Sequence, residues 1–229
     1  MKCVILPTKD VLEMQQNSSL EQLFENTQSR KTQKGQILLY QGEKTDDIFY
    51  IQNGYVKVYD VTADGDEKLL LILGSGDVFP LVWEFDSIRP LHYFYETITD
   101  ATFCITKRNT VIKKVGEDHK LALQMLQYFV DRTSNLMSRI ECIEATSAKH
   151  KVAQVLLYLA ESHGDEITNC TYKIRIPVTH QMIADMTGIN RSTASVQMKE
   201  LETEKMFNDS GSIGLIVLAD RVENFLEKK

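Results

Sequence analysis

The feature that most constrains the fold is a long apolar repeat, uninterrupted by proline, within residues 111–145. Its positions alternate in steps of four and three, which keeps them on one side of an α-helix and is typical of a two-stranded coiled coil. At about 1.5 Å per residue, one helix over this range would be roughly 50 Å long. The repeat consists of Val115, His119, Ala122, Leu126, Phe129, Thr133, Leu136, Ile140 and Ile143.

This repeat predicts a helix that pairs with a second copy of the chain. The expected dimer interface is Ala122, Leu126, Phe129, Thr133, Leu136, Ile140 and Ile143. A second apolar set is expected to pack on the N-terminal half of the same chain: Leu121, Met125, Tyr128, Val130 and Met137. The alternative is an ordinary long core helix within one subunit. Thr133 and His119 weaken the dimer interpretation, because a polar group in an apolar seam needs a partner or water.

Composition limits the class of protein. The 229 residues suit one large domain or two modest ones, with 43% hydrophobic and 25% charged residues. A net charge of −6 argues against coating nucleic acid through bulk charge but leaves room for a local reading surface. No signal-peptide pattern or apolar run near about 18 residues occurs, so a cytoplasmic protein without membrane contact is expected.

The cysteines indicate neither a metal site nor disulfides. Cys3, Cys104, Cys142 and Cys170 are scattered without a CxxC pair. The sequence also has no Ser/His/Asp or Cys/His arrangement, no phosphate-binding glycine loop and no cluster of metal ligands. We therefore expect no metal and no enzymatic activity.

From residue 33 the pattern changes to short alternating strands separated by glycine turns. After a short helical entry with Leu20, Leu23 and Phe24, strands are expected over 37–40, 48–51, 55–59, 68–73 and within 93–106. Asn53-Gly54 is a two-residue hairpin signal. Several short strands at near-regular spacing predict a small antiparallel barrel or sandwich.

The C-terminal part predicts a winged helix-turn-helix. The expected order is a hinge at 146–148, a helix ending at 163–164, a polar stretch over 165–171, a strand over 172–176, two helices, a wing over 205–218 and a last helix over 222–226. Thr179 suits the N-cap of the first of the two helices, and Gly188 suits the left-handed turn after it. The second is expected from Arg191 to about Thr203, with Val196 and Leu201 facing inward.

This second helix is expected to read DNA, because a recognition helix enters the major groove by its N-terminal end. Arg191 is the best candidate for a bidentate guanine contact, worth about 1–3 kcal/mol. Ser192 and Ser195 read bases more weakly, and Asn190 and Thr193 stand beside them. Phosphate contacts are assigned to Thr179, His180, Gln181 and Lys199. Residues 173–199 carry four basic side chains against one acidic, a local charge of +3.

Several motifs together resemble the cyclic-AMP receptor protein (CRP/FNR) family. They are YQGEK at 40–44, FYIQNG at 49–54, KV at 57–58, GDEK at 65–68 and GDVF at 76–79. Residues 178–204 resemble the DNA reader of that family, with Arg191 at its base-reading arginine, Ser192 at its glutamate and Val196 at its second arginine.

The resemblance implies an α+β fold in three parts. Residues 1–110 form an N-terminal antiparallel β-roll, a cupin-like sensor. Residues 111–145 form the long dimerisation helix, and residues 146–229 the C-terminal winged helix-turn-helix. It further implies a homodimeric transcription regulator whose partners are a near-palindromic double-stranded DNA operator and RNA polymerase.

The cyclic-nucleotide signature of the family is missing here. Members that bind cyclic nucleotides follow the Gly-Asp-x-Phe turn with a Gly-Glu that holds the ribose, but this chain reads FPLVW over 79–83. His92-Tyr93 replaces the Arg-Ser that takes the cyclic phosphate. Proline offers no backbone donor. Leu136 and Met137 stand where receptors of cyclic AMP present hydroxyls. We therefore do not expect cyclic AMP as the effector.

The aromatic-rich segment 79–95 predicts a pocket for another small, partly apolar or aromatic effector. The candidate pocket residues are Phe79, Trp83, Arg89, His92, Tyr93, Leu136 and Met137. Ordinary barrel core is an equal alternative, and haem bound by His92 is a weaker one. An iron–sulfur centre is rejected because only Cys3 lies near the N-terminus. A regulator that binds DNA constitutively, with the roll as a structural module, also stays open. No cofactor is certain.

Overall fold

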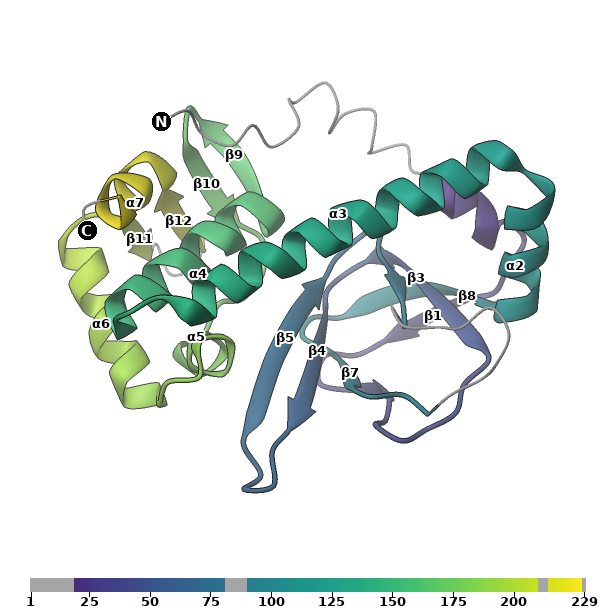
Figure 1. Ribbon diagram of the computed structural model, residues 1–229, viewed down its shortest axis with the longest axis horizontal. Coiled ribbons are helices and arrows are strands. Elements are labelled where there is room, and N and C mark those ends of the chain that lie inside the picture. Colours follow the sequence, from purple (N-terminus) through teal and green to yellow (C-terminus); the bar gives the residue numbers. More distant parts are fainter. Residues whose placement is uncertain (1–18, 81–89, 210–213, 228–229) are drawn as a thin grey trace.

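The computed structural model describes residues 19–80, 90–209 and 214–227. Two four-stranded antiparallel sheets form the N-terminal β-roll (Figure 1). One has the order β1 (Ser29–Thr32), β8 (Ala101–Lys107), β3 (Asp47–Asn53), β6 (Val78–Phe79). The other has the order β2 (Ile37–Leu39), β7 (Phe94–Thr97), β4 (Val56–Val61), β5 (Glu67–Leu73). A 3₁₀-helix, η1 (Ser19–Phe24), precedes them, and its Leu20, Leu23 and Phe24 are buried.

The Asn53-Gly54 hairpin prediction is wrong. β3 pairs with β8 and β6, whereas β4 pairs with β5 and β7, so the chain crosses from one sheet to the other at this point. Gly54 has φ +96°, and a Cβ there would lie 2.5 Å from the Asp100 carbonyl oxygen. The glycine is therefore required by a close backbone approach. The sequence pattern also missed β1, three of whose four residues are exposed.

The predicted single helix over 111–145 is two helices. α2 (Arg108–Glu117) ends before Asp118, and α3 (His119–Glu144) begins after it. Asp118 is extended, and its carboxylate accepts hydrogen bonds from the N–H groups of Lys120 and Leu121. A side-chain cap of this kind starts a new helix in place of continuing the old one. At 26 residues, α3 is about 39 Å long.

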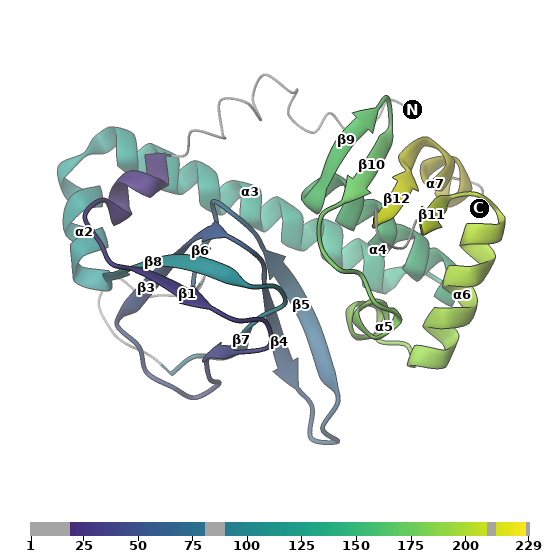
Figure 2. The ribbon, with the colours of Figure 1, turned by 180° about the vertical axis from the view of Figure 1, so that it is seen from behind.

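The C-terminal part has the predicted winged helix-turn-helix with one strand more than expected. It consists of α4 (Ala148–His163), β9 (Gly164–Thr168), β10 (Thr171–Ile174), α5 (His180–Thr187), α6 (Arg191–Thr203), β11 (Phe207–Asp209), β12 (Leu215–Leu218) and α7 (Ala219–Leu226). Its strands form one sheet in the order β11-β12-β10-β9, which Figure 2 shows in front of α4. The extra strand is β9, in the stretch expected to be a polar loop.

The two halves share a buried core along α3 and β5. Leu69 and Ile72 of β5 belong to the same apolar cluster as Leu156 of α4 and Met186 of α5. Both views place α5 beside β5, with α3 spanning the molecule above them (Figures 1 and 2). The helix-turn-helix is thus docked on the roll of its own chain. No helix within the described residues has the length and apolarity that a membrane span requires.

Candidate nucleic-acid interface

The first helix of the reader, α5, starts and ends at the predicted residues. The Thr179 hydroxyl accepts a hydrogen bond from the Met182 N–H at 3.1 Å, which caps the helix. Gly188 ends it with φ +68°, and its N–H donates to the Ala184 carbonyl at 2.9 Å. Because this left-handed angle strains residues with a Cβ, Gly188 fixes the turn between α5 and α6.

The second helix, α6, begins at a cap that involves three of the residues proposed to contact DNA. The Asn190 side-chain oxygen accepts a hydrogen bond from the Thr193 N–H at 2.8 Å and another from the Ser192 hydroxyl at 2.7 Å. Arg191 occupies the first position of the helix and is exposed. The cap therefore holds the backbone from which the arginine projects.

The proposed DNA-contacting side chains gather at the start of α5 and along α6. All are exposed or half-buried: Thr179, His180, Gln181, Asn190, Arg191, Ser192, Thr193, Ser195 and Lys199. Gln181 donates a hydrogen bond to Asp185 of its own helix at 2.7 Å. Their contacts with DNA stay a prediction.

The inward face of α6 differs from the predicted one. Ala194, Met198 and Leu201 are buried, whereas Val196 is 55% exposed. The expectation that Val196 faces inward is wrong, because the spacing 194–198–201 already supplies the stripe that packs on the core. Val196 therefore lies on the solvent side of the recognition helix.

Acidic side chains near the end of α6 are held by a lysine of α4. Lys149 Nζ lies 2.6 Å from Glu204 Oε1 and 3.8 Å from Glu200 Oε2. These ion pairs offset two negative charges that would otherwise repel phosphates.

Arg139 of α3 joins the roll to the reader. Its side chain is 3% exposed. Nη2 donates to the carbonyl oxygens of Met186 at 2.9 Å and Leu69 at 3.3 Å, and Nε donates to the Leu70 carbonyl at 3.4 Å. The guanidinium also lies 5.5 Å from the ring centroid of Tyr158 in α4. One side chain thus binds β5, α4 and α5 together.

A second buried polar group ties α3 to the turn before β6. Asp77 Oδ1 accepts from Arg132 at 3.0 Å, and Asp77 Oδ2 accepts from the Gly74 N–H at 2.8 Å. The Tyr128 hydroxyl accepts from the Val78 N–H at 3.0 Å. Burial raises the pKa of Asp77, and the Arg132 charge acts in the opposite direction. The GDVF turn at 76–79, one of the motifs that resemble the CRP/FNR family, is therefore anchored on α3.

Sequence reasoning missed Arg132 and Arg139. The available signal was spacing: with Tyr128, these residues repeat at intervals of four and seven on the side of α3 that buries Leu121 and Met125. An arginine in such a stripe is expected to have polar partners across the interface. Val130 and Met137, predicted to pack on the roll, are exposed instead.

The candidate effector residues differ in burial, and the pocket stays a prediction. Phe79 is fully buried in the roll, where its ring stacks on Phe49 at 4.8 Å and on Tyr95 at 5.3 Å between centroids. Leu136 and Met137 are exposed on α3. His92 is exposed and Tyr93 half-buried, while Trp83 and Arg89 lie outside the described residues.

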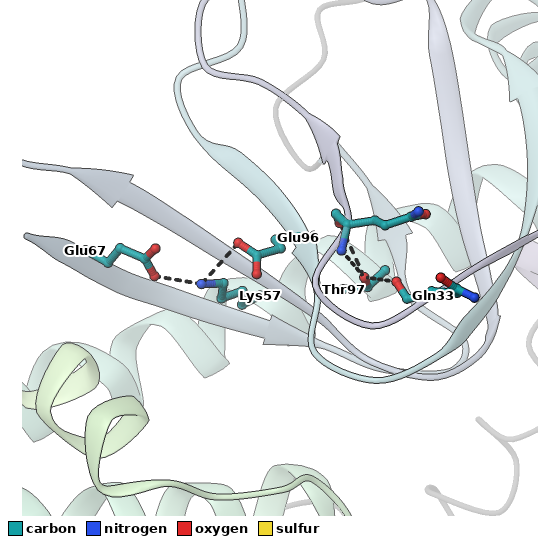
Figure 3. A network of polar contacts seen from close by, with 6 residues as sticks. Gln33, Lys57, Glu67, Glu96 and Thr97 are labelled. Carbon is teal, nitrogen blue, oxygen red and sulfur yellow. Dashed lines mark hydrogen bonds and ion pairs between the residues drawn. The ribbon is translucent and has the colours of Figure 1, made fainter. Parts of the chain in front are cut away.

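Charged groups on the β4–β5–β7 sheet are paired. Figure 3 shows Lys57 between Glu67 and Glu96, with its Nζ 2.6 Å and 3.2 Å from the two carboxylates. The same view shows the Thr97 hydroxyl, which donates to the Gln33 carbonyl at 2.7 Å and closes the loop before β2. In the part of the chain that the structure describes, no group of three or more His, Cys, Asp or Glu side chains is placed to hold a metal ion.

The predicted seam of α3 is a solvent-facing apolar stripe. Leu126 and Ile140 are 60% and 55% exposed, and Leu136 and Ile143 are also exposed. Ala122 and Phe129 are half-buried. The Thr133 hydroxyl donates to the Phe129 carbonyl one turn earlier, at 2.8 Å, so it is satisfied within its own helix. Thr133 therefore needs no partner in the seam.

Comparison with known proteins gives two family matches. Residues 29–117 match the cyclic nucleotide-binding domain, and residues 150–222 match the Crp-like helix-turn-helix domain. A CRP-like cAMP-activated global transcriptional regulator of Mycobacterium tuberculosis is 23% identical over 218 residues, 95% of this chain and 96% of the relative. The cAMP-activated global transcriptional regulator CRP of Pasteurella multocida is 25% identical over 196 residues, 84% and 91% of the two chains.

Solved structures show the same fold. FixK2 from Bradyrhizobium japonicum superposes with a TM-score of 0.72 at 20% identity, covering 86% of this chain and 96% of its own. A CooA mutant from Carboxydothermus hydrogenoformans gives a TM-score of 0.72 at 20% identity, covering 97% of this chain and 98% of its own. With the β-roll and the winged helix-turn-helix in the matching order, this chain belongs to the CRP/FNR family of DNA-binding transcription regulators.

Proposed function

We propose that this regulator acts as a homodimer whose two α3 helices pair through the exposed apolar stripe. The observation that carries the proposal is the exposure of Leu126, Leu136, Ile140 and Ile143 at heptad spacing. Burying one such side chain contributes about 1.5–3 kcal/mol, so leaving four in water is costly. Contiguous apolar patches of this kind mark interfaces, and a matching stripe on a second copy covers this one.

Pairing along α3 determines how DNA is read. Two-fold symmetry sets two α6 helices toward successive major grooves, about 34 Å apart, which requires a near-palindromic operator. Arg191 donates to guanine, and Ser192 and Ser195 contact neighbouring bases. Thr179, His180, Gln181 and Lys199 bind phosphates and set the register. RNA polymerase is the protein partner of the bound dimer at a promoter.

We further propose that a small effector other than a cyclic nucleotide acts through the roll. The support is the contact route from the 74–77 turn to Tyr128 and Arg132 of α3, and from Arg139 to β5 and α5. An effector that changes how the roll meets α3 would change the position of the reader. Such control requires different affinities for the effector in the two positions.

A constitutive regulator is the second candidate. In the buried core of the roll, the ring of Phe79 stacks on Phe49 and Tyr95 and meets Phe103 edge-on, which favours a structural module. Thermal-shift measurements against metabolite pools separate the candidates. Stabilisation by a metabolite supports effector control, whereas no stabilisation together with tight DNA binding by the purified protein supports the constitutive form.

The DNA-reading role is tested with Arg191→Ala. Loss of a bidentate guanine contact should weaken binding to the selected operator about 5- to 150-fold per contact. Fluorescence anisotropy with labelled duplex measures this change. Arg30→Ala, at an exposed arginine of β1, is the matched control and should bind as the parent does. Equal binding by Arg191→Ala and the parent would refute the assignment.

A further inference from the structure

Val196 has no role in the packing of α6. It is 55% exposed, while Ala194, Met198 and Leu201 on the other side of the helix are buried. A β-branched residue also lowers helix propensity slightly. Neither burial nor local helix stability therefore accounts for valine at this position.

Val196 lies among side chains that are proposed to contact DNA, one of them reading bases and one binding phosphate. Ser192 lies one turn before it and Lys199 about one turn after it, so the three share a face of α6. Serine side chains are short, and the Ser192 hydroxyl is bound to the Asn190 cap at 2.7 Å. The isopropyl group of Val196 consequently stands unshielded within this polar face.

We infer that Val196 is a specificity-determining residue that contacts the C5-methyl group of a thymine. This inference rests on the proposed insertion of α6 into the major groove. In that groove the thymine methyl is the apolar feature by which base pairs are told apart, and apolar side chains recognise it. An arginine or glutamine at the same place would favour guanine or adenine instead. Valine thus selects for T·A at one position in each half-site.

The test uses deoxyuridine, which differs from thymidine only by the missing methyl group. An operator is first selected from random duplexes with the full-length protein. Symmetric pairs of thymines are then replaced by uracil, one pair at a time, and affinities are measured for the parent and for Val196→Ala. At one pair of thymines, replacement by uracil should lower the affinity of the parent protein for the operator about fourfold per half-site. This is the effect expected from removing one buried contact of the size of a methylene group.

For Val196→Ala, uracil at that same pair should cause no further loss of operator affinity, because the contact between valine and the thymine methyl group is already absent. Ile167→Ala, at another exposed apolar residue in β9, is the matched control and should keep the full uracil effect. Thermal unfolding of both variants checks that they fold. The inference is overturned if no uracil pair weakens the parent, or if Val196→Ala keeps the same uracil sensitivity at every pair. Failure of the parent to select any sequence would instead overturn the proposed function itself.

Discussion

Buried polar residues mark the junction between the roll and the reader. Arg139 satisfies carbonyl groups of both parts, and Arg132 binds the buried Asp77. His163, at the end of α4, lies between the rings of Tyr55 and Tyr158, each 6.1 Å away between centroids. Its Nε2 is buried without a hydrogen-bond partner. The arginines keep these polar partners only while the two parts remain docked, whereas the unpartnered nitrogen of His163 costs free energy in the docked state.

His163 makes stability depend on pH. Burial, with the nearby charges of Arg132 and Arg175, lowers the pKa of His163 from its ordinary 6.5 to about 3. Below pH 6.5 the unfolded chain therefore binds a proton that the folded chain does not. The free energy of unfolding should fall by as much as about 1.4 kcal/mol per pH unit from this group between pH 6 and pH 4.

Urea unfolding of the parent and of His163→Phe across this range measures the effect. The phenylalanine ring keeps the shape but cannot titrate, so the difference in stability between the two proteins should change as pH falls. A difference that stays constant from pH 7 to pH 4 would contradict the assignment.

Single residues with local roles could be predicted from the sequence, whereas those with distant partners could not. Thr179 and Gly188 act through neighbouring backbone groups, and their roles follow from cap and turn preferences. The burial of Arg139 depends on Leu69 and Met186, which are far away in the chain. Val196 was misassigned because Ala194 and Met198 form an equally regular inward stripe.

At the scale of elements, the break between α2 and α3 decides where the long helix starts. We predict that Asp118→Ala lowers the free energy of unfolding by about 1 kcal/mol, because two N–H groups of α3 lose their cap. Asp118→Asn keeps a side-chain oxygen that can accept these hydrogen bonds, so its free energy of unfolding should fall by less. Chemical denaturation measures both variants. Equal stability of Asp118→Ala and the parent would show that the cap contributes nothing.

Docking of the reader on the roll depends on Arg139. Arg139→Met keeps much of the apolar length but removes the donors to Leu69, Leu70 and Met186. We expect a loss of roughly 2–3 kcal/mol, as for hydrogen bonds to a charged group. Hydrogen exchange should become faster in β5 and α5 together. Arg191→Met, at an exposed arginine, is the control; unchanged exchange in Arg139→Met would exclude the bridging role.

Strands were predicted more accurately than their pairing. The positions of β4 and β5 follow from alternation and from the glycine turn between them. The pairing of β3 with β8 depends on long-range contacts that a local hairpin signal at Asn53-Gly54 misrepresents. β9 was missed because four of its five residues are exposed, so it carries no alternation to detect.

At the scale of the whole molecule, three parts of the α3 surface have three different roles. One side packs on the roll through Leu121 and Met125, its C-terminal half holds the reader through Arg139, and the remaining side exposes the apolar stripe. The order of roll, helix and reader could be predicted from the motifs. The docking of α5 on β5 could not be predicted, because no sequence pattern relates one of these two surfaces to the other.

We propose that two copies pair through the α3 stripe and so present two Arg191 side chains to one duplex. Sedimentation equilibrium of the full chain at micromolar concentration, with and without operator DNA, tests it most directly. We expect a mass of two 26.2 kDa chains for the parent, and single chains with weak operator binding for the double variant Leu126→Asp, Ile140→Asp. Single chains of the parent under both conditions would contradict it.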